Sequence, residues 1–227
     1  MPGRRSRPWV PALVAVLSAC SPEPPQPAAP RLLALGDSVL AWHGTAGASV
    51  PDVVGRLTGR AVDNRAVSGA RLSATSPKVA AKGGDIRAQY PGGAWDWVIL
   101  NGGANDLLAE CGCRACDSTL DAMIGRDGRR GDIPALVDRI VADGAKVVVL
   151  GYYDANVKPN PFSRCSEEVD ELDRRLEEMA RVRKTVTFVD AAPAMNPRDP
   201  ADWFVDRVHP SRQGAARIGE RIAAAMQ

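Results

Sequence analysis

The sequence predicts an α/β domain in which a parallel β-sheet carries helices on both faces. Two features of the 227-residue chain predict this class. Short apolar segments alternate with segments whose apolar residues recur every three or four positions, which is the pattern of strands alternating with amphipathic helices. The apolar segments are also continuous rather than alternating, which is typical of strands covered on both faces. We therefore expect a three-layer α/β/α sandwich.

The strands are predicted where apolar and β-branched residues lead into turn residues. The segment 145–151 (AKVVVLG) is the clearest, and 62–67 is the weakest. Five strands in about 195 residues suit a flavodoxin-like five-stranded parallel sheet. The predicted strands are 31–36, 62–67, 97–101, 145–151 and 186–190.

The helices are predicted between the strands. The strongest is 166–183, because five of its apolar residues form one stripe and two glutamates lie in its first turn. Ser211 is expected to cap the last helix, and Cys165 is expected on the apolar face of the helix at 166–183. The predicted helices are 49–57, 118–124, 133–142, 166–183 and 211–226.

The first 30 residues differ in kind from the rest. Residues 1–19 have a basic start and an apolar run too short to span a bilayer, as in a signal peptide. The run ends in Leu17-Ser18-Ala19-Cys20, which resembles the bacterial lipobox and implies a lipid-modified Cys20. A plain signal peptide with an incidental cysteine is the alternative. We expect a lipoprotein signal peptide at 1–19, a lipidated cysteine and proline-rich tether at 20–30, and a folded domain at 31–227.

The tether composition favours an extended chain. Residues 21–30 (SPEPPQPAAP) hold five prolines and no large apolar side chain. Such a segment favours polyproline II at roughly 3 Å per residue, which would hold the domain roughly 30 Å from a membrane. We therefore expect an exported protein, anchored by its N-terminal lipid and facing the periplasm or the cell exterior.

The charge balance gives no reason to expect nucleic acid as a partner. The chain has 29 basic and 27 acidic residues, and three of the basic ones lie in the leader. Without them the balance is 26 to 27, a net charge of −1. A nucleic-acid-binding domain of this size is usually strongly basic. We expect a monomer.

Apart from Cys20 the chain has four cysteines, and disulfides are expected of an even number in an exported chain. A bond between Cys111 and Cys113 would be strained, which leaves two connectivities for Cys111, Cys113, Cys116 and Cys165. A structural zinc site and a redox pair at Cys113 and Cys116 are the alternatives. The spacing does not match two zinc knuckles, and the redox pair lacks a thioredoxin-like context.

Polar clusters stand at the ends of predicted strands, where the functional residues of parallel sheets gather. They are Gly36-Asp37-Ser38, Ser68-Gly69-Ala70, the segment 102–106 (GGAND) and, before the last helix, the segment 206–210 (DRVHP). If the fold is right, these four loops open on one edge of the sheet.

The clusters hold the parts of a catalytic triad. A serine hydroxyl needs a base, which is usually histidine. The chain has two histidines, and His209 has Asp206 three residues before it, where a turn can orient the imidazole toward Ser38. His43 has no carboxylate spaced to orient it, so we expect it to pack beside Trp42 in the pocket wall. Asp37 is expected to cap a helix after Ser38.

A tetrahedral intermediate also needs hydrogen-bond donors for its oxyanion. The backbone N–H groups of Ser38 and Gly69 and the side-chain amide of Asn105 are the candidates. Trp95 and Trp97 are expected in the core rather than at a ligand site.

Together these blocks resemble the GDSL/SGNH hydrolases. Gly36-Asp37-Ser38, Ser68-Gly69, the segment 103–106 and the segment 206–210 match the family's four blocks in order, across residues 31–227. The resemblance implies Ser38 as nucleophile, Asp206 and His209 as its triad partners, and Ser38, Gly69 and Asn105 as the oxyanion hole. Val39 replaces the family's leucine and stays apolar. The cysteine insert at 111–116 is not part of the motif and leaves the substrate open.

The resemblance implies a serine esterase that hydrolyses acyl esters without metal or other cofactor. Its substrate would be a small-molecule, lipid or glycan acyl ester. An O-acetyl deacetylase of cell-wall or exported glycans is the alternative within enzymes. A non-catalytic binding lipoprotein on the same fold, and an envelope redox or metal protein built on the cysteines, are the alternatives outside it. An α/β-hydrolase is disfavoured, because the Gly-x-Ser-x-Gly elbow is missing.

Overall fold

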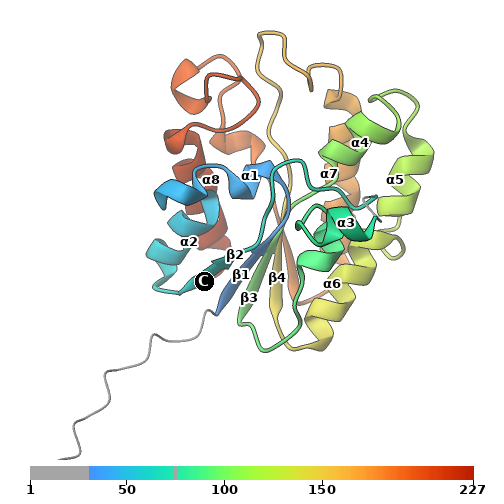
Figure 1. The fold of residues 1–227 in the computed structure, drawn as a ribbon, viewed down its shortest axis with the longest axis vertical. Coiled ribbons are helices and arrows are strands. Elements are labelled where there is room, and N and C mark those ends of the chain that lie inside the picture. Colours follow the sequence, from blue (N-terminus) through green and yellow to red (C-terminus); the bar gives the residue numbers. More distant parts are fainter. Residues whose placement is uncertain (1–30, 74–75) are drawn as a thin grey trace, which may run out of the picture.

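The computed structural model describes residues 31–73 and 76–227. In this part of the chain five strands form one parallel sheet in the order β2-β1-β3-β4-β5. The α/β prediction is therefore confirmed (Figure 1). The expected signal peptide, Cys20 and tether lie outside the described residues. The strands are β1 (Leu32–Leu35), β2 (Val62–Asn64), β3 (Trp97–Leu100), β4 (Lys146–Leu150) and β5 (Val186–Val189).

Burial follows position in the sheet. All four residues of β1 and of β3 are buried, as continuous apolar sequence predicts for central strands. The edge strand β2 is half-buried and ends three residues before the predicted position 67. An edge strand has a partner on one side alone. Beyond Asn64 the chain still follows β1, because the N–H groups of Arg65 and Val67 donate to backbone oxygens of Ala34 and Gly36.

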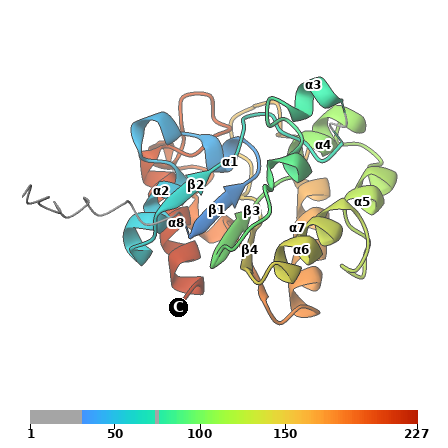
Figure 2. The same cartoon turned by 60° about the horizontal axis from the view of Figure 1, so that its bottom comes forward.

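Helices cover both faces of the sheet. In Figures 1 and 2, α2 (Val50–Thr58) and α8 (Arg212–Ala225) lie on one side, and α5 (Asp117–Met123), α6 (Asp132–Ala142) and α7 (Ser166–Arg181) on the other. The backbones of α2 and α8 come close at Gly219, where an added Cβ would lie 2.6 Å from Cγ1 of Val53. Among the described residues, no helix is both long and apolar enough to cross a membrane.

Short helices mark the loops of the carboxyl edge. The helix expected after Asp37 is α1 (Ser38–Ala41). The structure adds α3 (Pro77–Ala80) and α4 (Ala104–Glu110), for which the sequence pattern is too short to predict a helix. Single 3₁₀ turns are η1 (Gly44–Ala46), η2 (Ile86–Gln89), η3 (Ala192–Ala194) and η4 (Pro200–Asp202). Ser211 caps α8 as expected, since its hydroxyl accepts from the N–H groups of Gln213 and Gly214 at 3.1 Å.

One detail of α7 was predicted wrongly. The helix begins at Ser166, so Cys165 is its N-cap residue rather than part of its apolar face. The N–H of Cys165 donates to the carbonyl of Phe162 at 2.8 Å, which belongs to the preceding turn. The helix also ends at Arg181, two residues before the predicted end.

Two disulfides hold the loop after α4. Cys111 bonds to Cys116, and Cys113 bonds to Cys165, so the pairing is one of the two that avoid a Cys111–Cys113 bond. All four sulfurs are thereby used, which leaves no thiolate for a zinc site or a Cys113–Cys116 redox pair. The second bond spans 52 residues and fastens the insert to the start of α7. Bonds that close loops of this length commonly stabilise a fold by about 2–4 kcal/mol.

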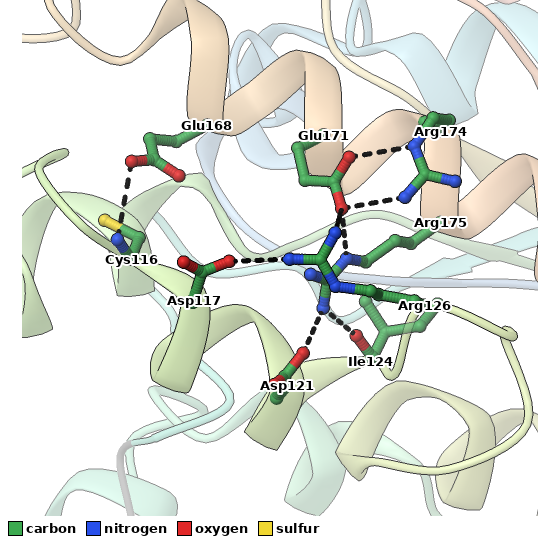
Figure 3. A network of polar contacts seen from close by, with 9 residues as sticks. All are labelled: Cys116, Asp117, Asp121, Ile124, Arg126, Glu168, Glu171, Arg174 and Arg175. Carbon is green, nitrogen blue, oxygen red and sulfur yellow. Dashed lines mark hydrogen bonds and ion pairs between the residues drawn. The ribbon is translucent and has the colours of Figure 1, made fainter.

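A buried arginine joins α5 and α7 beneath the insert (Figure 3). Arg175 is fully buried, and its guanidinium donates to Glu171 and Asp121 at 2.7 Å and to the carbonyl of Ile124 at 2.8 Å. Figure 3 also shows Arg126 between Asp117 and Glu171. Removing one partner of a buried ion pair usually costs several kcal/mol, so this network fixes how the two helices pack.

Asp173 gives the fold a testable pH dependence. Burial raises the pKa of Asp173 to about 8, with a smaller contribution from Asp190, although the N–H of Tyr152 donates to its Oδ2 at 2.9 Å. Between pH 4 and pH 8 the folded protein therefore holds a proton that the unfolded chain has released, and the free energy of unfolding falls as pH rises. We expect Asp173→Asn to leave stability unchanged at pH 4 and to raise it at pH 8, on the order of 3 kcal/mol.

Thermal unfolding of both proteins across this pH range measures the effect. Asp127→Asn, at an exposed carboxylate, is the matched control and should show no such trend. An equal difference in Tm between Asp173→Asn and the parent at pH 4 and pH 8 would contradict the assignment.

Candidate active site

The polar loops named from the sequence meet at the carboxyl edge of the sheet, near α1 in Figure 1. A cavity of about 100 Å³ opens there. Ser38, Asn105 and His209 line it together, although they lie up to 171 positions apart in the chain. The cavity walls also include Tyr152, Tyr153, Phe162, Val169 and Trp203, and polar side chains of Asp154, Asn160, Asp170 and Arg207.

Ser38 is held at the start of a helix. It is the first residue of α1, and Asp37 is the N-cap, with its Oδ1 accepting from the N–H of Val39 at 2.9 Å. Asp37 thus caps the helix, as expected. Gly36 has a φ of 152°, and an added Cβ would lie 2.4 Å from the carbonyl oxygen of Asn101. Glycine lets the chain turn tightly from β1 into α1, which places the Ser38 side chain at the cavity.

His209 lies in a short loop whose two ends, at Trp203 and Pro210, pair with each other. A bridge between Trp203 and Pro210 forms its base, and the N–H of Phe204 donates to the carbonyl of His209 at 2.9 Å. Asp206 Oδ2 lies 2.7 Å from Nδ1 of His209. Asp206 Oδ1 accepts from the N–H groups of Val208 and His209, both at 3.0 Å. The turn therefore orients the imidazole by its own carboxylate.

The charge of Asp206 is stabilised in this turn. Partial burial opposes the charge, but the hydrogen bonds from His209 and from two backbone N–H groups outweigh it, so the pKa of Asp206 lies below its ordinary value. A charged acceptor at Nδ1 favours the tautomer in which Nε2 is free to take a proton. The pair can therefore serve as base and orienting carboxylate.

The indole of Trp42 stacks on the face of the His209 imidazole. The rings of Trp42 and His209 stack with centroids 3.8 Å apart and an angle of 7° between their planes. His43 points elsewhere, with Nε2 3.1 Å from the carbonyl oxygen of Pro210 and its ring edge-on to Phe204. His43 packs beside Trp42 as expected, with ring centroids 6.4 Å apart, but neither residue is among those that line the cavity. The stacking of Trp42 on the base was not expected, because nothing in a sequence pairs positions 42 and 209.

The donors proposed for an oxyanion lie on separate loops. The Asn105 amide donates to the carbonyl of Ala70 at 3.2 Å and keeps a second N–H for the cavity. Within the described residues, the backbone N–H groups of Ser38 and Gly69 donate to no other group. Gly69 has a φ of 76° and adjoins Ala70, but it is not among the residues that line the cavity.

Asp106, on α4, holds the loop that carries Gly69. The residue is fully buried, and its carboxylate accepts from the N–H groups of Leu72 at 3.1 Å and Ser73 at 2.7 Å. Burial raises the pKa of Asp106, and these N–H groups oppose that rise. Asp106 therefore holds the loop that carries Gly69 against the helix that carries Asn105.

Two tyrosines after β4 were missed by the sequence analysis. The hydroxyl of Tyr152 donates to Asp37 at 2.6 Å, and the hydroxyl of Tyr153 donates to the carbonyl of Val208 at 2.8 Å. Both therefore bond to a residue adjoining Ser38 or His209. The available signal was their position, because they follow the fourth strand directly. Trp97 is buried in the core and Trp95 is partly buried, in line with expectation.

The chain resembles known proteins in sequence pattern and in fold. Residues 34–217 match the model of the GDSL-like lipase/acylhydrolase family. No curated protein sequence is significantly similar to the chain.

Solved structures share the fold. An inhibitor-bound aryl esterase from M. smegmatis is 18% identical, with a TM-score of 0.61 over 87% of this chain and 98% of that one. A carbohydrate acetylesterase from Sinorhizobium meliloti is 17% identical, with a TM-score of 0.59 over 86% and 96%. A lipase from a goat rumen metagenome is 16% identical, with a TM-score of 0.55 over 86% and 96%. With the family match and the cavity that Ser38, Asn105 and His209 share, the chain belongs to the GDSL-like lipase/acylhydrolase family and is an ester-hydrolysing enzyme.

Proposed function

We propose that the enzyme cleaves short-chain acyl esters outside the cytoplasm through a triad of Ser38, His209 and Asp206. The observation that carries the proposal is the cavity that Ser38 and His209 line together, with Oδ2 of Asp206 2.7 Å from Nδ1 of the His209 imidazole. This is the order of nucleophile, base and orienting group that activates a serine hydroxyl.

The reaction would proceed in two halves. His209 takes the proton of Ser38 as the hydroxyl oxygen attacks the ester carbonyl, and the N–H groups of Ser38 and Asn105, which line the cavity, bind the oxyanion. Gly69, on the adjoining loop outside the cavity lining, is the third candidate donor. The intermediate collapses, His209 protonates the leaving alcohol, and an acyl group stays on Ser38. His209 then activates a water molecule, which releases the acid and restores the serine.

The size of the cavity supports a short acyl group. Its volume of about 100 Å³ is below the roughly 300–1,000 Å³ of pockets that enclose drug-sized ligands. The aromatic rings of Tyr152, Tyr153 and Trp203 wall it. A long acyl chain would have to leave such a cavity and lie exposed to water, which forfeits most of its hydrophobic binding energy.

The two disulfides and the leader support an exported protein, since disulfides persist in oxidising compartments. Arg31 is the first described residue and directly precedes β1, so it lies at the amino edge of the parallel sheet. The cavity is lined by residues such as Ser38 and Asn105 that follow the carboxyl ends of the strands, at the edge near α1 in Figure 1. A lipid anchor at Cys20 would therefore attach to the end of the domain remote from the active site. That arrangement favours substrates beyond the membrane over lipids of the anchoring leaflet.

An O-acetyl deacetylase of glycans is the second candidate. The polar side chains of Asp154, Asn160 and Arg207 line the cavity and could hydrogen-bond to sugar hydroxyls. The structural relative from Sinorhizobium meliloti is a carbohydrate acetylesterase, which is consistent with this candidate.

Hydrolysis of p-nitrophenyl esters from acetate to palmitate by protein lacking residues 1–20 tests the proposal. We expect kcat/KM to be highest for acetate to butyrate and to fall by about tenfold or more for octanoate and longer esters. Rates that rise with chain length to palmitate would contradict the short-acyl assignment. Release of acetate from O-acetylated xylan, with a kcat/KM above that for p-nitrophenyl acetate, would favour the deacetylase.

A further inference from the structure

One tyrosine hydroxyl joins the two loops that carry the nucleophile and the oxyanion amide. Tyr152 is the second residue after β4 and is 8% exposed. Its hydroxyl donates to Oδ2 of Asp37 at 2.6 Å and accepts from the N–H of Ala104 at 3.2 Å. The Tyr152 ring also lines the active-site cavity.

Each partner of this hydroxyl directly precedes a residue of the proposed machinery. Asp37 precedes Ser38, and Ala104 precedes Asn105. The oxyanion is bound well only if the donors of these two loops converge on one point within about 0.5 Å. A single hydroxyl bonded to both loops fixes that separation.

The segment that directly precedes Asn105 has no polar side chain with which to hold its own position. Gly102, Gly103 and Ala104 carry no polar side chain. Gly103 has a φ of 121°, and an added Cβ would lie 2.6 Å from Cδ2 of Leu172. The hydrogen bond from the N–H of Ala104 to Tyr152 fixes this segment from the side of Ser38. Asn105 and Asp106 fix the same loop on the side of Gly69, through Ala70 and through Leu72 and Ser73.

Tyr152 is itself fixed in place. Its backbone N–H donates to Asp173 at 2.9 Å, and the N–H of Gly151 donates to the carbonyl of Val189 at 2.9 Å. Burial raises the pKa of the Tyr152 hydroxyl well above its ordinary value, so the hydroxyl stays protonated and remains a donor to Asp37. The carboxylate of Asp37 is 1% exposed and depends on that donor and on the N–H of Val39 for its hydrogen bonds.

We propose that Tyr152 is a positioning residue, which through Asp37 and Ala104 sets the distance between the Ser38 nucleophile and the Asn105 oxyanion donor. The proposal rests on the catalytic roles proposed above for Ser38 and Asn105. It concerns the hydroxyl rather than the ring, so Tyr152→Phe removes the feature in question and keeps the packing.

We expect Tyr152→Phe to lower kcat on p-nitrophenyl acetate by about 10- to 100-fold and to change KM by less than about twofold, because the lost contact acts on transition-state geometry. Tyr90→Phe is a matched control. The Tyr90 hydroxyl also donates to a carboxylate at 2.6 Å, that of Asp143, and Tyr90 is 5% exposed and not among the residues that line the cavity. This control should lose comparable stability and keep its kcat.

A boronic acid inhibitor separates positioning from a merely structural role. Phenylboronic acid forms a tetrahedral adduct with an active-site serine, and its Ki reports how well the oxyanion hole binds that geometry. In Tyr152→Phe the Ki should rise by the same factor by which kcat/KM falls. All variants are compared at a temperature at which circular dichroism shows them folded.

The possible outcomes are distinct. A kcat within twofold of the parent, or an unchanged Ki beside a lowered kcat, would overturn the positioning role. An equal loss of kcat in Tyr90→Phe would show that the effect is one of stability alone, and would also overturn it. Full activity in Ser38→Ala would instead contradict the proposed function, regardless of the kcat and Ki measured for Tyr152→Phe.

Discussion

Replacing Ser38 with alanine is expected to lower kcat/KM on p-nitrophenyl acetate by about 10⁴-fold or more, and His209→Ala to do the same. Ser38 and His209 line the same cavity, and in the proposed mechanism the hydroxyl of Ser38 becomes acylated. Without the hydroxyl no acyl-enzyme forms. Without the imidazole the hydroxyl keeps its proton and is a weak nucleophile. What remains is the stabilisation that the oxyanion donors give to direct attack by water.

The losses of activity in Ser38→Ala and His209→Ala should not be additive. Because Ser38 and His209 act in one step, the double variant should be about as slow as either single variant. Ser118→Ala, at an exposed serine on α5, is the control and should keep full activity. Substantial hydrolysis by folded Ser38→Ala would place the nucleophile elsewhere in the cavity.

Asp206→Asn is expected to reduce kcat by about 10⁴-fold with little change in stability. The Oδ1 of an asparagine can still accept from the N–H groups of Val208 and His209, which keeps the turn. Its amide, however, would face Nδ1 of His209, where Asp206 now accepts at 2.7 Å. An amide donor there favours the tautomer whose Nε2 carries a proton and cannot act as a base.

Steady-state kinetics and thermal unfolding of Asp206→Asn measure both effects. Asp199→Asn is a suitable control, because Asp199 is a partly exposed carboxylate on the same loop that accepts from the N–H of Ala201 at 2.9 Å. A loss of less than about tenfold in Asp206→Asn would show that the imidazole does not depend on this carboxylate for its orientation.

The framework of the fold could be predicted because a strand that is buried on both faces needs a continuous run of apolar residues, which is visible in the sequence. Continuous apolar sequence located four of the five strands, and the alternation with amphipathic helices predicted the parallel arrangement. The prediction was less accurate for β2, because an edge strand is less buried and its apolar signal is weaker. The short helices α1 and α4 have too few turns for a periodic pattern, so their ends came from the structure.

The meeting of Ser38, Asn105 and His209 at one cavity could be predicted, because each lies in a polar cluster beside a predicted strand or helix end and such clusters gather at one edge of a parallel sheet. The contacts that support these residues could not be predicted. Tyrosine and tryptophan beside a strand look like core residues in a sequence, and the partners of Tyr152 and Trp42 lie far away in the chain. The disulfide pairing needed coordinates for the same reason, because spacing left two connectivities open.

The central claim is that Ser38 forms the covalent intermediate with help from His209. Labelling with a fluorophosphonate, followed by peptide mass spectrometry, tests it most directly. We expect one phosphonyl adduct, on the peptide that contains Ser38, with labelling slowed by about 10³-fold or more in His209→Ala and absent in Ser38→Ala. An adduct on another residue, or labelling of Ser38 at an unchanged rate without His209, would contradict the account.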